Sequence, residues 1–164
     1  MWFPRLPRKR PFRVGRSRTG LGLFATAPIE KRAFVAEYKG RKLTTEAADK
    51  LEARGNRYLY EINSRWTIDG TNRRNLARYA NHSCRPNAES HHAGHRVFLR
   101  ALKAIKPGDE ITYDYGRDYF RNVITPSRCK CVKCREKRAA AQRARRSAKA
   151  RAAKRLAKAR RKKS

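Results

Sequence analysis

Apolar and polar side chains alternate along much of the first 115 residues, with the repeat of two that is typical of half-buried strands. The pattern predicts a strand leaving a tight turn at 18–22, and further strands at 34–38, 58–62, 66–68, 97–99 and 110–115. Turns at Gly40, Ala93-Gly94 and Pro107-Gly108 separate several of them. Two segments have helical signals: a capped helix from Thr44 to Gly55, and a short helical turn over 75–80. We therefore predict a β-rich fold, mainly β with short helices.

Charge divides this chain of 164 residues into a central region and two basic ends. Residues 1–19 contain seven Lys/Arg and no acid, while residues 135–164 contain fifteen Lys/Arg and one acid, out of a net charge of +31. The remaining residues, 20–134, have an ordinary globular composition and are numerous enough for one modest core. We expect neither end to contribute to that core.

The C-terminal segment is of low complexity, with ten alanines beside its fifteen basic residues. Alanine and arginine favour helix, but Leu156 is its only large apolar side chain and like charges three or four positions apart repel. We predict a disordered or fluctuating tail that becomes ordered on a polyanion. Non-sequence-specific binding of nucleic acid is the expected role, with a merely solvated segment as the alternative.

Nothing in the sequence resembles a membrane span or a secretory signal, because Met1 to Pro4 are followed by charges rather than by an apolar run. The expected location is cytoplasmic, with no membrane partner. In that reducing compartment, four cysteines with three of them clustered indicate a metal rather than disulfides. Three thiols cannot close a tetrahedral zinc site, and Cys84 can complete the set of Cys129, Cys131 and Cys134. The alternative is four unligated thiols in a flexible segment.

Two segments have unusual residue sets: Asn-His-Ser-Cys at 81–84, within the stretch 78–87, and Tyr-Asp-Tyr-Gly at 113–116. In chain order they stand with Gly-x-Gly at 20–22, Glu-Tyr-x-Gly at 37–40, Ile-Asp-Gly at 68–70 and the cysteine triplet. The combination resembles the SET-domain protein-lysine N-methyltransferases, in a small, bacterial-type form with a post-SET-like cysteine cluster. The resemblance covers residues 18–134.

The sequence departs from the family pattern in several respects, and the expected cysteine-rich segment before the domain is one that it lacks. Arg74 stands where a glycine often precedes Asn75, and the triplet has the spacing C-x-C-x2-C instead of C-x-C-x4-C. No aromatic residue follows Cys134 to close a lysine channel, which leaves Tyr119 or Phe120 for that place.

The resemblance implies a SET-domain β-clip with knot-like C-terminal threading, plus flexible basic tails. It divides the chain into a basic Pro/Arg-rich arm, a SET domain, a post-SET-like zinc segment and the Ala/Lys/Arg-rich tail, over 1–16, 17–116, 117–134 and 135–164. It implies S-adenosylmethionine and Zn²⁺ as cofactors. The cofactor-binding residues would be the backbone of Thr19, Gly20 and Leu21, the ring of Tyr58, and Asn81 with His82. Without the resemblance, a plain turn at 19–22 and a core histidine at 82 are the simpler interpretations.

The chemistry that the resemblance implies is methyl transfer to the ε-amine of a lysine. Deprotonating that amine near pH 7 costs roughly 4–5 kcal/mol in free solution, and both a neighbouring sulfonium and a narrow apolar channel reduce the cost. Tyr115 would be the catalytic tyrosine, Tyr38 a channel wall, and Tyr113 the position that tunes methyl number, here toward mono- or dimethylation. The alternative treats Tyr113 and Tyr115 as two residues on one face of a half-buried strand.

The expected protein substrate contains lysine, for example a basic protein bound to nucleic acid, and the tails would bring the enzyme there, to the nucleoid or, in a eukaryotic cell, to the nucleus. The rival hypothesis is a histone-like nucleic-acid-binding protein with a catalytically weak or self-methylating SET domain. In that case the tail lysines would be methylated in cis: Lys149, Lys154, Lys158, Lys162 and Lys163. The histidines at 91, 92 and 95 are predicted to lie in a solvated hairpin loop.

Overall fold

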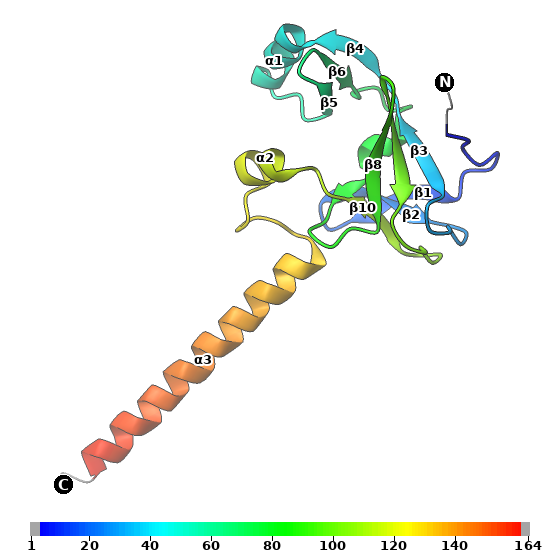
Figure 1. Cartoon of the computed structure of the whole chain (residues 1–164). Coiled ribbons are helices and arrows are strands. Elements are labelled where there is room, and N and C mark those ends of the chain that lie inside the picture. The colour runs from blue at the N-terminus through cyan, green and yellow to red at the C-terminus, as the bar shows by residue number, and fades with distance from the viewer. Residues whose placement is uncertain (1–3, 162–164) are drawn as a thin grey trace.

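A computed structural model describes residues 4–161 of the chain, and three small sheets form its folded part (Figure 1). The first has the order β1-β2-β10-β7, from Phe12–Ser17, Gly20–Ala25, Glu110–Tyr113 and Asn81–His82. The second has the order β3-β9-β8, from Phe34–Tyr38, Arg96–Ala101 and Ala88–Ala93. The third has the order β4-β6-β5, from Arg41–Thr44, Trp66–Asp69 and Leu59–Asn63. The predicted β-rich class is confirmed, while the knot-like threading stays a prediction.

Short helices connect and flank the sheets: α1 at Thr45–Ala53, η1 at Leu76–Tyr79, α2 at Arg117–Tyr119 and η2 at Phe120–Ile124. Helix α1 begins where the sequence predicts, because the Thr44 hydroxyl accepts a hydrogen bond from the Ala47 N–H at 3.4 Å. It ends before Gly55, whose φ of 88° suits a residue without a side chain. The strand predicted to reach residue 115 ends at Tyr113.

The pairing of β7 with β10 positions the two unusual motifs beside each other. These strands are parallel, with Thr112 opposite Asn81 and Tyr113 opposite His82. The other edge of β10 pairs antiparallel with β2, where Ile111 lies opposite Leu23. Both of these apolar side chains are fully buried. The sheet therefore brings the glycine turn, the Asn-His motif and the tyrosine motif together from three distant parts of the chain.

Two sequence expectations are wrong in this part of the fold. The N-terminal arm contributes to the core, because β1 pairs with β2 along its whole length and Phe12 is only 8% exposed. Residues 88–93 form strand β8, which the sequence did not predict because its side chains are polar; pairing with the buried strand β9 supplies the order. The turn at Gly94 is present, but His91 packs on Phe34 and His92 contacts Tyr60, so neither lies in a solvated loop.

The C-terminal segment is one continuous helix, α3, at Val132–Arg161. The high helix propensity of alanine and arginine favours this helix, and the disordered or fluctuating tail that the sequence indicates stays a prediction. The Arg138 guanidinium anchors the first turns by donating to the carbonyls of Cys129 and Pro126, and the helix then leaves the domain (Figure 1). Within residues 4–161, no helix combines the length and apolarity that crossing a membrane requires.

A tyrosine-lined cavity beside a four-cysteine cluster

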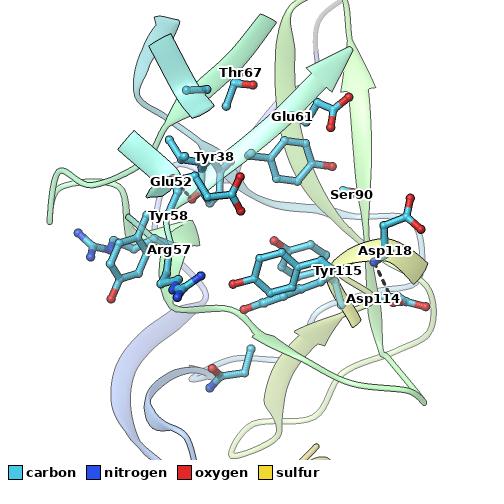
Figure 2. A pocket seen from close by; sticks show the side chains of 18 of the residues that line it. Tyr38, Glu52, Arg57, Tyr58, Glu61, Thr67, Ser90, Asp114, Tyr115 and Asp118 are labelled. Carbon is cyan, nitrogen blue, oxygen red and sulfur yellow. Dashed lines mark hydrogen bonds between the residues drawn. The ribbon is translucent and has the colours of Figure 1, made fainter. Parts of the chain in front are cut away.

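A cavity with a volume of about 1150 Å³ is lined by residues of α1 and the third sheet on one side and of the α2 segment on the other. All seven tyrosines of the chain line it: Tyr38, Tyr58, Tyr60, Tyr79, Tyr113, Tyr115 and Tyr119. Figure 2 shows Tyr115 in a central group of rings, with the ring of Tyr58 at the left side of the cavity. The sequence analysis did not predict Tyr60 and Tyr79 as channel-wall residues. It named Tyr119 only as one of two candidates for closing the channel.

Of the three predicted catalytic tyrosines, Tyr38 and Tyr113 are buried and Tyr115 is half-buried, and all three line the cavity. Tyr38 and Tyr113 are 6% and 7% exposed, and the rings of Tyr113 and Tyr115 are 4.7 Å apart. The Tyr38 hydroxyl donates to the Tyr58 carbonyl at 2.9 Å, and the Tyr115 hydroxyl donates to the Ala80 carbonyl at 2.7 Å. Burial raises the pKa of all three phenols above the usual value of 10.0, so they are neutral at physiological pH.

Local backbone geometry explains how these rings converge. In β10 alternate residues are buried, which directs Ile111 and Tyr113 inward. Gly116 follows with a φ of 93°, a conformation that suits glycine, and reverses the chain into α2. This turn places the Tyr119 ring 5.4 Å from Tyr115. Three of the seven tyrosines, Tyr113, Tyr115 and Tyr119, thus come from one short segment.

The predicted cofactor-binding residues Thr19, Gly20, Leu21, Tyr58 and Asn81 all line the cavity. The glycine turn joins β1 to β2 as a hairpin and also lines the cavity. Its geometry therefore fits a plain turn as well as a cofactor-binding turn. The Asn81 side-chain amide donates to the Leu21 carbonyl at 2.9 Å and to the Glu110 carboxylate at 2.7 Å. This contact fixes the turn against β7, and leaves its backbone facing the cavity.

His82 is the predicted cofactor residue that does not line the cavity. Its side chain is 5% exposed, and its Nε2 lies 3.2 Å from the Cys84 Sγ. Its Nδ1 accepts a hydrogen bond from the Tyr115 N–H at 3.3 Å, and Phe120 packs against the ring. The imidazole therefore supports the backbone of Tyr115 from behind, and burial lowers its pKa. Between the two candidates for closing the channel, Tyr119 lies at the cavity and Phe120 lies behind it.

Arg78, which the sequence left undecided between a surface charge and a support for the turn, supports the cavity wall. Its guanidinium lies 3.4 Å from the centre of the Tyr58 ring and donates to the Thr71 carbonyl. A cation over an aromatic face is attractive, most strongly when partly desolvated. Arg78 thereby fixes the orientation of the ring that is predicted to contact the cofactor.

The four cysteines form one cluster in which all sulfur atoms lie within 4.8 Å of one another. The Sγ atoms of Cys84 and Cys134 are 3.6 Å apart, close to the ~3.8 Å that two ligands of a tetrahedral zinc thiolate site require. Burial raises the pKa of Cys129 to about 11, whereas in Cys131 the effect of burial is outweighed by hydrogen bonds from the backbone of Cys84 and Cys134, which lower its pKa to about 7. The number, type and spacing of these ligands fit Zn²⁺, as predicted.

The cysteine cluster links the Asn-His motif at 81–82 to the segment that begins with α2. Cys84 follows the Asn-His motif directly, and the triplet closes the segment that begins with α2. A metal here would hold residues 116–134 against that motif, with Tyr119 at the cavity.

Comparison with known proteins gives a consistent family. The protein-family model described as "SET domain" matches residues 20–116 of this chain. The chain is 33% identical over 141 residues to the H3 lysine-4 specific histone-lysine N-methyltransferase of Emericella nidulans, covering 78% of this chain and 12% of that protein. It is 36% identical over 126 residues to the trithorax histone-lysine N-methyltransferase of Drosophila virilis, covering 71% and 3%. It therefore spans only a small part of these eukaryotic relatives, and a bacterial type stays a prediction.

Solved structures agree with this. One is ctPRC2 in an autoinhibited conformation bound to S-adenosylmethionine, with a TM-score of 0.58 and 28% identity over 65% of this chain and 15% of that one. Another is the Chaetomium thermophilum polycomb repressive complex 2, with a TM-score of 0.57 and 28% identity over 64% and 15%.

Proposed function

The chain belongs to the SET-domain family, and from this premise we propose that it is an S-adenosylmethionine-dependent protein-lysine N-methyltransferase. The observation that carries the proposal is the gathering of all seven tyrosines around one cavity, which the glycine turn and Asn81 also line. The relatives named above are histone-lysine methyltransferases, which supports the same reaction class. When bound, S-adenosylmethionine supplies the methyl group.

The residues that would hold the cofactor are the backbone at Thr19 to Leu21, the ring of Tyr58 and the side chain of Asn81. They fit a ligand with an amino-acid end and a flat base, because they offer backbone polar groups at a glycine turn and an aromatic face. The Asn81 side-chain amide donates its hydrogen bonds to Leu21 and Glu110, so its role toward the cofactor is mainly to shape the turn.

The tyrosines create an environment in which a lysine amine loses its charge. Their rings exclude water, which disfavours an ammonium, and their hydroxyls remain neutral because burial raises their pKa. The Tyr115 hydrogen is committed to the Ala80 carbonyl, so its lone pairs are left to accept from the amine N–H and orient it. Tyr115 thus acts by positioning rather than as a base.

Tyr113 is the residue that we propose limits the number of methyl groups. Its side chain is buried and lines the cavity, and its hydroxyl has no hydrogen-bond partner among residues 4–161. A hydroxyl at this place can hold water and crowd the amine, which favours mono- or dimethylation.

The four-cysteine cluster would hold Zn²⁺ in a structural role. We propose that the metal keeps the α2 segment closed over the site, since the closed, four-thiolate ligand set leaves no position for substrate.

For the basic ends we propose attachment to nucleic acid. Helix α3 extends about 45 Å at 1.5 Å per residue, and Lys and Arg recur throughout its sequence. Such a helix binds phosphates without reading sequence, and places the enzyme in the nucleoid or, in a eukaryotic cell, in the nucleus. A mobility-shift titration should show affinity that falls steeply with salt. A variant with six α3 arginines changed to glutamine should lose most of it, and equal affinity of the two proteins would reject the tether.

The enzymatic proposal is tested by incubating the full-length protein with methyl-labelled cofactor and a panel of basic proteins. Label on lysines of an added protein is the expected result. Label confined to the chain itself would favour the self-methylating alternative; of its candidate lysines, Lys162 and Lys163 lie outside the described residues. Absence of cofactor binding would favour the histone-like protein with an inactive domain.

A further inference from the structure

The mouth of the cavity is acidic, although the chain as a whole is strongly basic. Five of the thirteen acidic residues line the cavity, against three arginines: Asp49, Glu52, Glu61, Asp114 and Asp118 beside Arg57, Arg78 and Arg117. The guanidinium of Arg78 is stacked on Tyr58 and bonded to Thr71, so it is turned to the wall. The local charge balance is therefore the reverse of that of the chain.

Four of these carboxylates are available to a ligand. Asp49, Glu52, Glu61 and Asp118 are exposed, and none lies within 4.0 Å of a basic group in the part of the chain that the structure describes. Asp114 differs, because its carboxylate is 3.7 Å from His82 Nδ1 and accepts from the Gly116 N–H. The chain has 44 Lys/Arg, yet the other four carboxylates form no ion pair among the described residues.

A second observation inside the cavity indicates what these carboxylates surround. The Tyr113 hydroxyl belongs to a side chain that is 7% exposed and lines the cavity, and it has no hydrogen-bond partner among the described residues. The hydroxyl is accessible from the cavity and has no partner among those residues, so it is free to bind a polar group of a ligand that enters between the rings. The ligand is thus polar at its tip and meets carboxylates at the mouth.

The positions of the carboxylates fit an extended chain that crosses the mouth. Glu52 comes from α1, Glu61 from β5 and Asp118 from α2, and Figure 2 shows all three around the tyrosine cluster. In an extended peptide, neighbouring residues are about 3.3 Å apart along the chain, so side chains one to three positions from the inserted lysine remain over the mouth.

We infer that Glu52 and Glu61, with Asp118 opposite them, are specificity-determining residues that select a target lysine flanked by lysine or arginine. The inference rests on the proposed methyltransferase function and adds to it the class of sequence around the target. An exposed ion pair alters affinity by about 2- to 5-fold, and several act together when one segment meets them all. They also counter the repulsion that the basic chain exerts on a basic substrate within the screening length of ~8 Å.

The test uses the full-length protein and two acceptor peptides of equal length, each with one lysine, flanked by arginine in one and by glutamine in the other. Methyl transfer gives KM and kcat for each peptide, and fluorescence anisotropy gives the affinity of each without turnover. The wild-type protein is expected to favour the arginine peptide in KM and in affinity. In the double variant Glu52→Gln/Glu61→Gln, the KM for that peptide should rise about tenfold, and the preference should shrink accordingly. Glu30→Gln removes an exposed carboxylate outside the cavity and should keep the full preference.

The two readouts separate failure of this inference from failure of the proposed function. Methyl transfer without charge preference, or a preference that survives in the double variant, overturns the inference and leaves the function standing. Charge-dependent anisotropy that the double variant loses, without any methyl transfer, supports the acidic mouth and rejects the enzyme. Absence of both binding and transfer overturns both.

Discussion

Replacing Tyr115 with phenylalanine removes one hydroxyl from a side chain whose surroundings are otherwise unchanged. The hydroxyl donates to the Ala80 carbonyl at 2.7 Å, within the segment that leads into Asn81. The loss of that bond should reduce the free energy of unfolding by about 1 kcal/mol, the net value of a typical intramolecular hydrogen bond. The ring contacts with Tyr113, Tyr119 and His82 persist in the variant, so the fold should be kept.

The effect on turnover should be larger than the effect on stability. In the proposed reaction the same oxygen orients the amine, and the loss of one positioned group typically costs on the order of 100-fold in kcat, or about 2.7 kcal/mol in the barrier. We therefore expect Tyr115→Phe to lose at least ~100-fold in kcat. The two effects are separable, because a decrease of 1 kcal/mol in stability leaves a folded enzyme at 25 °C.

The assay measures kcat under saturating cofactor and acceptor, with the melting temperature and cofactor affinity of each variant as controls. No tyrosine of the chain lies outside the cavity, so cofactor affinity replaces a remote Tyr→Phe control. A kcat within threefold of wild type, in a variant shown to be folded and to bind cofactor, would refute the assignment of Tyr115. A large loss accompanied by unfolding would instead assign the hydroxyl a structural role.

Three further predictions concern neighbouring groups. Tyr113→Phe removes the unpartnered hydroxyl and should shift products toward higher methylation, and an unchanged methyl distribution by mass spectrometry would contradict this. Chelation of the zinc, verified by metal analysis, should lower both the melting temperature and turnover because α2 would lose its anchor; metal-free protein that keeps both would rule out the structural role. Glu37→Gln removes a carboxylate that holds Arg96 through bonds of 2.7 and 2.8 Å and should reduce the free energy of unfolding at pH 7 by about 2 kcal/mol. Hydrogen bonding by Arg96 lowers the pKa of Glu37 in the folded protein from 4.5. The stabilisation by the Glu37–Arg96 pair is therefore complete above pH 4.5 and is lost as the pH falls through the lowered pKa of the folded state. A stability difference between variant and wild type that persists at about pH 2 would contradict the assignment.

The sequence predicted the centre of the site better than its edges. The motifs at 81–84 and 113–116 are distinctive because their residue types are tied to one chemistry, and the β7–β10 pairing places them in register. The four cysteines were predictable for the same reason, since a tetrahedral thiolate site leaves few choices.

The carboxylates at the mouth have no such signal. Glu52 lies on an exposed helix face and Glu61 alternates with apolar neighbours, so each resembles an ordinary surface residue until α1, β5 and α2 meet. Strand β8 was missed because its order comes from β9 rather than from its own side chains. For His82, the resemblance suggested cofactor contact, but only the packing of the ring shows that it faces the cysteine cluster.

Because every phenol of the chain borders one cavity, the ultraviolet difference spectrum of its tyrosines observes that cavity alone. Ligands that enter it will perturb an absorption band to which no distant tyrosine adds background, and alkaline titration will report the ionisation of those same seven rings. The protein thus carries its own optical probe, and occupancy of the site can be followed without a label.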